Sequence, residues 1–335
     1  MSVPRNSPGD TSKIRTQQVP CRLCGAADAD FLFDGMDRLY DVEGSFRYVR
    51  CKRCGLVYMN PQVVPECIGS LYPREYGPHA DKSRAPRTAL LKLRDRIPRI
   101  PILGRVFRSL TDARAIGPVL HKLNARTRLL DVGCGNGSFL DAMRRQTACE
   151  VHGLDLSPAA VEQAKRLYGL NIFWGTIAQA PFAAESFDVT TAWWYLEHVP
   201  NPQESIKEMA RLLKPGGLCV IGVPNSDSYL ARIFKDKWYH LDCPRHLCIW
   251  SPSTMRRLLA DHGLVVRKIA YDRTPWGLLG SLQYRIYGDN RDPRHKNRIR
   301  QSALLWMVSV PLTLVIALLR KSDIMTVVAE KGATG

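Results

Sequence analysis

A glycine-rich turn that follows an apolar run is the feature that most limits how this chain can fold. Residues 129–132 read LLDV, residues 133–137 read GCGNG, and a helical pattern begins at Ser138. Glycines let the backbone turn tightly and approach a ligand closely, and the N-terminus of a helix offers free N–H groups. Asp155 closes the next apolar run, where a carboxylate can accept hydrogen bonds from ribose hydroxyls. The sequence therefore predicts a strand, a turn and a helix that hold a nucleotide-type cofactor.

Apolar runs alternate with amphipathic segments from Thr127 onward, and this rhythm predicts an α/β fold with helices on both faces of a parallel sheet. Helices are expected to begin near residues 137, 157, 203 and 251. Strands are expected at residues 128–132, 151–156, 171–174, 187–194, 217–223, 262–270 and 323–331. A long insertion at about 273–321 separates the last two of these strands.

The spacing of the glycines distinguishes between classes of cofactor site. A dinucleotide fingerprint reads GxGxxG and needs its third small residue at the position of Ser138, whereas this chain reads GxGxG. At this point the chain resembles the class I S-adenosylmethionine-dependent methyltransferases, whose motif DxGxGxG begins with an acidic residue and whose second strand ends with another. The matching residues are Asp131, Gly133, Gly135, Gly137 and Asp155. The alternatives are a glycine-rich turn without a ligand and a nicotinamide or flavin site.

The resemblance covers residues 126 to about 272 and the final strand, and it includes FDVTTAWWYLEHVPNP and LKPGG. It implies a Rossmann-like, seven-stranded, mostly parallel sheet and S-adenosylmethionine as the cofactor. Many relatives hold the adenine amine with an acidic residue after the third strand, whereas Gly175-Thr176-Ile177 offers only a hydroxyl and backbone groups there. A place in the core is the alternative for Trp193. The further cofactor contacts that we expect are Cys134, Leu156, Thr176, Ile177 and Trp193.

Three histidines are candidates for the base that methyl transfer to a hydroxyl would require. His198 follows the fourth expected strand, where this kind of fold displays its ligands, and His240 and His246 lie in KWYHLDCPRHL. The segment DCPRHL resembles one found in small-molecule methyltransferases of the ubiquinone type. We expect His198 and His246 to be the catalytic residues, and a structural role is the alternative for each.

Two CxxCG turns predict a small zinc site near the N-terminus. Each turn presents two thiolates, and together Cys21, Cys24, Cys51 and Cys54 would complete the tetrahedral coordination of Zn²⁺. Four sulfur ligands leave no open position, so the metal is expected to be structural. Free or disulfide-linked cysteines are the alternative, but a chain without a signal peptide is expected in the cytoplasm, where thiols stay reduced.

The rest of the chain sets the expected domain boundaries. Residues 1–18 are polar and are expected to form a disordered tail, 19–62 the zinc-ribbon module, 63–125 a basic helical connector and 126–335 the methyltransferase domain. The net charge of +17 favours anionic partners. A four-cysteine ribbon and positive charge keep RNA as an alternative partner. However, Trp193-Trp194-Tyr195-Leu196 matches neither the amino-methylating nor the cytosine-C5 nucleic-acid enzymes, so nucleic acid is less favoured.

The insertion contains an uncharged segment, ALLWMVSVPLTLVIALL at residues 303–319, between basic flanks. A helix of this length would measure only ~25 Å against a hydrocarbon core of ~30 Å, and Pro311 is expected to interrupt it. Because the strands before and after it are expected to be antiparallel neighbours, the segment must leave and return on one side of the sheet. We therefore expect either an interfacial helix pair that contacts an anionic membrane through residues 291–321, or an apolar lid or homodimer surface.

These observations together predict an enzyme that methylates a small-molecule acceptor, with a hydroxyl on a sugar or on a lipid-linked intermediate as the favoured target. An RNA methyltransferase and a non-catalytic S-adenosylmethionine-binding scaffold are the alternatives.

Overall fold

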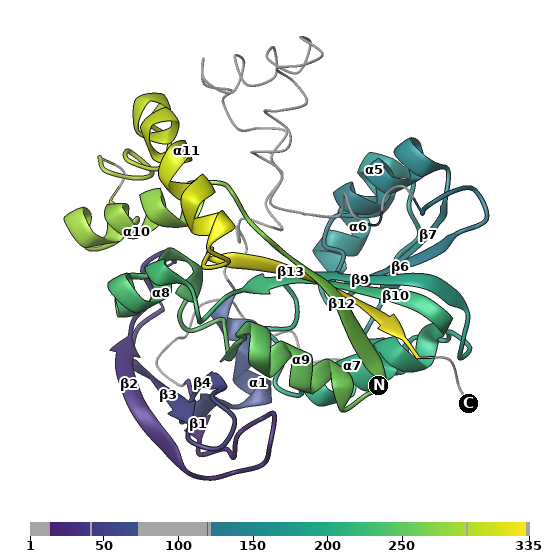
Figure 1. Cartoon of the computed structure of the whole chain (residues 1–335), viewed down its shortest axis with the longest axis horizontal. Helices are drawn as coiled ribbons and strands as arrows, with labels where there is room; N and C mark the ends of the chain where they lie inside the picture. The colour runs from purple at the N-terminus through teal and green to yellow at the C-terminus, as the bar shows by residue number, and fades with distance from the viewer. Residues whose placement is uncertain (1–13, 41, 73–118, 120–121, 293, 333–335) are drawn as a thin grey trace.

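The computed structural model describes residues 14–40, 42–72, 119, 122–292 and 294–332. Residues 73–118 and 120–121 of the expected basic connector 63–125, and residues 1–13 of the expected N-terminal tail, lie outside these ranges. The described chain forms a seven-stranded sheet, a four-stranded sheet and a two-stranded pair. Figure 1 shows the larger sheet through the middle of the molecule, with the smaller sheet at lower left.

The seven-stranded sheet has the order β12-β13-β10-β9-β6-β7-β8. Six of its strands point in the same direction, and β13 is antiparallel to both of its neighbours. This topology confirms the predicted Rossmann-like fold. It also confirms that the strands before and after the insertion, β12 and β13, are antiparallel neighbours. The strands are β6 (Arg128–Val132), β7 (Glu150–Asp155), β8 (Phe173–Trp174), β9 (Phe187–Trp193), β10 (Leu213–Pro224), β12 (Leu264–Tyr271) and β13 (Ile324–Lys331).

Helices cover both faces of this sheet, as Figure 1 shows. On one face α5 (Ser138–Thr147) and α6 (Pro158–Tyr168) pack on a core that includes Leu129, Val189 and Val220. On the other face α7 (Pro202–Leu212) and α9 (Pro252–Ala260) pack on the alternate strand residues. Successive residues of a strand point to opposite faces, so one strand supplies both cores.

The sequence marks the ends of these helices with residues that satisfy their terminal backbone groups. The Ser157 side chain accepts a hydrogen bond from the N–H of Ala160 at the start of α6, and Gly169 ends that helix in the left-handed conformation. Ser251 and Thr254 form a capping box at the start of α9. Local capping therefore fixes where the helices begin and hence where the loops between strand and helix lie.

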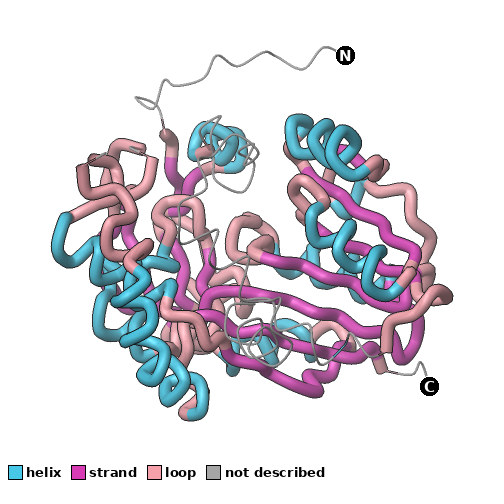
Figure 2. The backbone as a smooth tube through the Cα atoms, turned by 90° about the horizontal axis from the view of Figure 1, so that it is seen from above, coloured by secondary structure: helices cyan, strands magenta, loops and turns pink. Residues whose placement is uncertain are grey.

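The four-stranded sheet combines three strands from the N-terminal module with one short strand from much later in the chain. Its order is β11-β4-β3-β2, and the edge strand β11 comes from the segment that follows the large domain's fifth parallel strand. Figure 2 shows this sheet beside the larger one. The strands are β2 (Ala29–Gly35), β3 (Phe46–Cys51), β4 (Val57–Met59) and β11 (Cys248–Ile249), and the separate pair is β1 (Thr16–Gln17) with β5 (Gln62–Val63).

These pairings move the expected domain boundaries. Residues 1–18 were expected to form a disordered tail, but strand β1 lies within them. Because β1 pairs with β5, this part of the expected tail is ordered. The small module also continues past residue 62 into α1 (Pro65–Ile68) and a 3₁₀ turn at Gly69–Leu71, whose Leu71 is fully buried. Since β11 belongs to the same sheet, residues 19–62 do not form a separate unit from residues 126–335.

Between β10 and β11 the chain forms short helical pieces that pack beside the small sheet. They are α8 (Tyr229–Phe234) and the 3₁₀ turns Lys235–Lys237 and Tyr239–Leu241, and a further 3₁₀ turn spans Ile177–Gln179 in the large domain. Their buried side chains Leu230, Trp238 and Leu241 share a core with β3 and β4.

The insertion forms two helices with different surroundings. Helix α10 (Trp276–Tyr287) buries Leu279 and Tyr284 against the protein, whereas α11 (Ala303–Leu318) buries only Thr313 and Ile316. An interfacial helix pair is therefore wrong for α10, and only α11 presents an apolar surface. The helix also continues through Pro311, because a proline removes a single backbone N–H from the helical ladder. Among the described helices, none is long and apolar enough to cross a membrane.

Candidate active site

The glycine-rich loop leaves the carboxyl end of β6 and leads into α5. Its three glycines have φ values of +70°, +55° and +76°, a backbone region that side chains rarely adopt. The Asp155 carboxylate at the end of β7 accepts hydrogen bonds from the backbone N–H groups of Gly135 and Ser157, both at 2.8 Å. The carboxylate thus holds the loop in place while its remaining lone pairs can accept from a ligand.

The space around the loop suits a ligand that approaches Gly135. A methyl group on Gly133 would lie 2.7 Å from the Tyr195 ring, and one on Gly137 would lie 2.9 Å from Leu170, whereas one on Gly135 would meet no described atom within 4 Å. The outer two glycines are therefore required by packing, and the middle one faces open space. Together with Asp155, this arrangement is the candidate site for a nucleotide-type cofactor.

Asp131, which begins the motif, is buried in β6. Its Oδ1 atom accepts a hydrogen bond of 2.6 Å from the hydroxyl of Thr191 on the neighbouring strand β9. The Cys134 thiol faces the backbone of Gly153, so this residue turns its side chain toward the core. Any contact of Cys134 with a cofactor would therefore come from its backbone.

The other expected cofactor residues lie at the same edge of the sheet with different exposures. Leu156 is 63% exposed directly after Asp155, and Ile177 is buried. The Thr176 hydroxyl bonds to Gln179 in a capping box. Trp174, which the sequence reasoning did not include, is 61% exposed and donates a hydrogen bond to the Leu156 carbonyl. Two exposed apolar side chains thus stand beside the open side of the loop.

Trp193 lies in the core rather than on an open floor. Its ring packs edge-on against Phe139 at a centroid distance of 5.4 Å, and a methyl group on Gly222 would lie 2.6 Å from it. Its neighbour Trp194 instead stacks on His240 at 5.6 Å. The expected cofactor contact at Trp193 remains a prediction, and Trp194 is the tryptophan nearer to the histidines.

His198 and His246, the two expected catalytic residues, lie together although they come from separate segments. Their ring centroids are 4.6 Å apart. His198 is half-buried, and its Nδ1 atom lies 2.9 Å from the Tyr72 hydroxyl. His246 is buried, and burial lowers its pKa well below the usual value.

Glu197 completes this group, which we call the Glu197 cluster: Glu197, His198 and His246. One carboxylate oxygen and one ring nitrogen from each histidine lie within 4.8 Å of one another. Glu197 is fully buried, and burial raises its pKa to about 8. The sequence placed it beside His198 but gave no signal of its burial, since Glu is seldom buried without a partner.

The segment DCPRHL also contains Arg245, for which the sequence predicted no role. The guanidinium donates to Asp37 through Nη1 at 2.8 Å and Nη2 at 2.9 Å, and to Asp242 at 2.7 Å. The side chains of Arg245 and Asp37 are both fully buried. This ion pair joins the small sheet's β2–β3 loop to the segment that carries His246, so it positions the Glu197 cluster.

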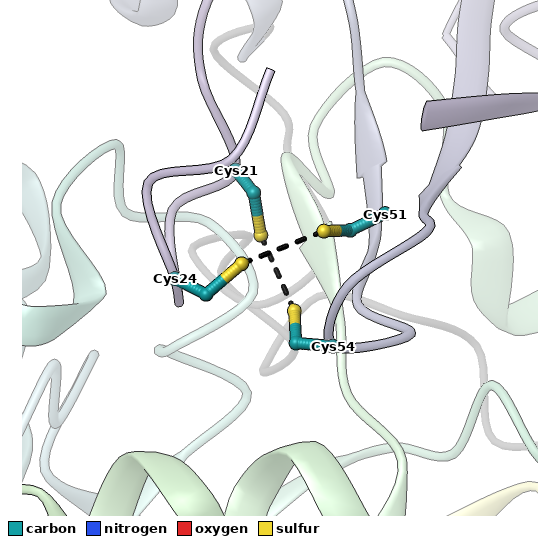
Figure 3. Close-up of side chains that lie close together, drawn as sticks. All are labelled: Cys21, Cys24, Cys51 and Cys54. Carbon is teal, nitrogen blue, oxygen red and sulfur yellow. Dashed lines mark hydrogen bonds between the residues drawn. The ribbon is translucent and has the colours of Figure 1, made fainter. Parts of the chain in front are cut away.

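The four predicted zinc ligands converge, as Figure 3 shows. The Sγ atoms of Cys21 and Cys54 are 3.4 Å apart, and those of Cys24 and Cys51 are 3.5 Å apart. Sulfurs ~2.3 Å from one tetrahedral Zn²⁺ would be ~3.8 Å apart, so the four thiols fit the ion. All four cysteines are free of disulfides, and a metal at this position would be structural.

The small module that carries the four cysteines packs into the large domain. Cys21, Leu23 and Tyr58 share one buried core with Leu130 and Ile221 of the large sheet. The Gln203 side chain of α7 also donates a hydrogen bond to the Leu23 carbonyl in the first CxxC turn. This packing favours a role in holding parts of the protein together.

Comparison with known proteins agrees with the sheet order and the loop. Residues 104–269 match a family model described as a methyltransferase domain. The chain is 34% identical over 155 residues to a ubiquinone biosynthesis O-methyltransferase of Alkalilimnicola ehrlichii, which covers 42% of this chain and 62% of that protein. The corresponding Neisseria meningitidis serogroup A protein is 32% identical over 152 residues, with coverages of 42% and 64%.

A third relative is the 2-methyl-6-phytyl-1,4-hydroquinone methyltransferase 2 of Oryza sativa subsp. japonica, which is 36% identical over 118 residues, 34% of each chain. The chain thus spans less than two thirds of the length of these relatives. The fold, the motif from Asp131 to Gly137 and the family match over residues 104–269, just under half of the chain, show that this part of the chain is similar to class I S-adenosylmethionine-dependent methyltransferases.

Proposed function

We propose that this protein transfers the methyl group of S-adenosylmethionine to a hydroxyl oxygen of a small molecule. The observation that carries the proposal is the position of the Glu197 cluster next to the glycine-rich loop. Strands β6 and β9 are parallel neighbours, so the segments that follow Val132 and Trp193 leave the same edge of the sheet. The Tyr195 ring lies against Gly133, which brings the two segments into contact.

The residues of this site have separate roles in the proposed reaction. The bound sulfonium supplies the methyl group, and close alignment in a dry pocket accelerates such an in-line displacement. Asp155 and the loop hold the adenosyl part. His198 accepts the hydroxyl proton of the acceptor, because it is half-buried and bonded to Tyr72, whereas the ring of His246 is buried.

The relatives support oxygen as the acceptor atom, since two of them are named O-methyltransferases of ubiquinone biosynthesis. The finer proposal is an acceptor that is lipid-linked, with a sugar hydroxyl as the second choice. The surface of α11 supports a lipid-linked acceptor, because the exposed side chains along most of this helix are apolar. They are Leu304, Leu305, Met307, Val308, Leu312, Val315 and Leu318.

We expect an Asp155→Ala variant to bind S-adenosylmethionine about 10- to 100-fold more weakly than the wild type, because a hydrogen bond to a charged group contributes ~1.5–3 kcal/mol. Titration calorimetry with S-adenosylmethionine and its demethylated product measures the change. An Asp155→Asn variant keeps an acceptor oxygen for Gly135 and separates loss of charge from loss of the loop. Glu162→Ala, on the exposed face of α6, is the matched control. Absence of binding by the wild type would contradict the proposed function.

The apolar helix gives a second expected result. We expect the protein to float with vesicles that contain anionic phosphatidylglycerol and to float less at high salt, because exposed basic residues such as Lys296 and Arg320 flank α11. A Leu304→Glu/Val308→Glu double variant should lose flotation and keep its affinity for the cofactor. Light scattering in solution tests the homodimer alternative. A wild type that remains in the lower fraction at low salt rules out the membrane surface.

Incubation of the protein with labelled S-adenosylmethionine and with separate lipid, small-molecule and RNA fractions tests the acceptor class. We expect label in a lipid or small-molecule product. Label in RNA would support an RNA methyltransferase instead, and cofactor binding without any labelled product would support a scaffold. The packing of the ribbon into the large domain supports a structural use of the zinc module over RNA binding.

A further inference from the structure

Arg300 is a positively charged side chain that packs against aromatic rings. Its guanidinium carbon lies 5.2 Å from the centre of the Tyr239 ring and 5.8 Å from the centre of the Trp276 ring. Its Nη1 atom donates a hydrogen bond to the Tyr239 hydroxyl, whereas the buried Nε atom has no acceptor among the described residues. Burial lowers the pKa of the guanidinium, and no described carboxylate forms an ion pair with it. The described residues therefore leave this charge unbalanced.

Two other arginines with largely buried side chains do have acidic partners. Arg245 contacts Asp37 and Asp242. Arg38 contacts Asp236, with 2.7 Å between Nη2 and Oδ2. A guanidinium stays charged at neutral pH, and the burial of a charge without a partner is costly. An arginine that is buried without such a partner is therefore expected to meet its counter-charge in a ligand.

The fold holds Arg300 in this position. The buried side chain of Gln283 in α10 accepts a hydrogen bond of 2.9 Å from the N–H of Ile299 and donates one of 2.6 Å to the carbonyl oxygen of His295. The turn that leads into α11 is thereby fixed to α10. Arg300 and Tyr239 are both half-buried, so a ligand can reach them from solvent.

Ring contacts join this position to the candidate active site. The rings of Tyr239 and His240 are 5.1 Å apart, and the His240 ring stacks on Trp194 at 5.6 Å. Trp194 directly follows β9, in the same segment as Glu197 and His198. The guanidinium thus lies within three ring contacts of the segment that carries the proposed base.

We propose that Arg300 and Tyr239 bind a phosphate group of the acceptor, an inference that rests on the proposed function. The planar fork of a guanidinium fits two oxygens of a phosphate. The Tyr239 hydroxyl accepts its hydrogen bond from Arg300 and keeps its own hydrogen for the same ligand. A carboxylate that binds the fork uses both of its oxygens, whereas a phosphate has a further oxygen for the phenol.

The surface beside Arg300 favours a lipid phosphate as the source of this group. Helix α11 begins at Ala303, and its exposed side chains Leu304 and Val308 are apolar. A lipid phosphate would place its chain on α11 and its phosphate on Arg300. A sugar phosphate offers the same phosphate without the apolar chain, so small probes can distinguish the two sources.

Calorimetry with three probes tests the site. The full chain, with and without the demethylated cofactor product, is titrated at low salt with hexyl phosphate, glucose 1-phosphate and hexanoate. We expect both phosphates to bind, and hexyl phosphate to bind more tightly because its chain contacts α11. Hexanoate should bind at least about 10-fold more weakly than hexyl phosphate, because it forgoes a charge-assisted hydrogen bond.

Variants locate the binding. Arg300→Met should weaken hexyl phosphate binding about 10- to 100-fold, and Tyr239→Phe, which keeps the ring, about 2- to 10-fold. Arg298→Met, at an exposed arginine of the same turn, is the matched control: it removes the same net charge and should bind as the wild type does. In phosphate-free buffer Arg300→Met should unfold at or above the wild-type temperature, because it removes an unpaired buried charge.

Equal losses of affinity in Arg300→Met and Arg298→Met would show only a general attraction to a basic protein and would overturn the site. Hexanoate that binds as tightly as hexyl phosphate, or a lower unfolding temperature of Arg300→Met, would also overturn it. Tighter binding of glucose 1-phosphate would support the site with a sugar phosphate as its source. S-adenosylmethionine binding is measured on the same samples: a chain that binds the cofactor but neither phosphate contradicts only the site, and the reverse contradicts only the proposed function.

Discussion

An Arg245→Met variant is expected to lose about 3–5 kcal/mol of unfolding free energy, the usual result of removing one partner of a buried ion pair. The methionine would leave the carboxylates of Asp37 and Asp242 without their shared cation, and the Asp37 side chain is fully buried. Water cannot replace the guanidinium at such a position, so the full desolvation cost of the carboxylate remains. Urea unfolding followed by circular dichroism measures the loss.

The exposed pair of Arg47 and Asp34 provides the matched control. It also joins two strands of the small sheet, but its side chains are 54% and 41% exposed. Surface ion pairs contribute at most ~1 kcal/mol, so Arg47→Met should change the unfolding free energy little. An Asp37→Asn/Arg245→Met double variant should recover part of the loss, because it removes one of the two uncompensated charges. Equal stabilities of Arg245→Met and Arg47→Met would show that the buried pair does not hold the two parts together.

The parts of this structure that the sequence predicted are those encoded locally. The glycine spacing from Gly133 to Gly137 requires a tight turn, and Asp155 at the end of the next apolar run places the carboxylate beside it. The paired CxxC turns likewise predicted the four thiols that converge in the small module. Repeated strand and helix patterns then limited the sheet to one family of topologies.

The parts that the sequence did not predict depend on contacts between distant segments. Strand β11 has only two residues, and its pairing with β4 depends on where the two domains pack. Arg245 and Glu197 belong to residue types that are mostly exposed, so their burial follows from the tertiary fold and not from any local pattern. Tyr72, which contacts His198, lay in a stretch that was expected to be a connector.

The second prediction with a large expected effect concerns the four cysteines of the zinc module. A Cys51→Ser variant is expected to hold one tightly bound zinc ion fewer per chain and to unfold far below the wild-type temperature, because structural zinc contributes ~10–16 kcal/mol in small zinc domains. Cys67→Ser is the matched control: this half-buried cysteine lies in the same module but outside the four ligands, and its variant should keep the zinc. Elemental analysis and thermal unfolding measure both quantities.

The same variant also tests whether the two sheets form one cooperative unit. Cys51 and Leu56 share a core with Leu130 and Val223 of the large sheet, and β11 pairs with β4. Loss of zinc should therefore expose part of the large domain's core and lower the stability of the whole chain in a single transition. Two separate unfolding steps of the Cys51→Ser chain, with the large domain unfolding at the wild-type temperature, would instead show that the zinc module folds independently of the large domain.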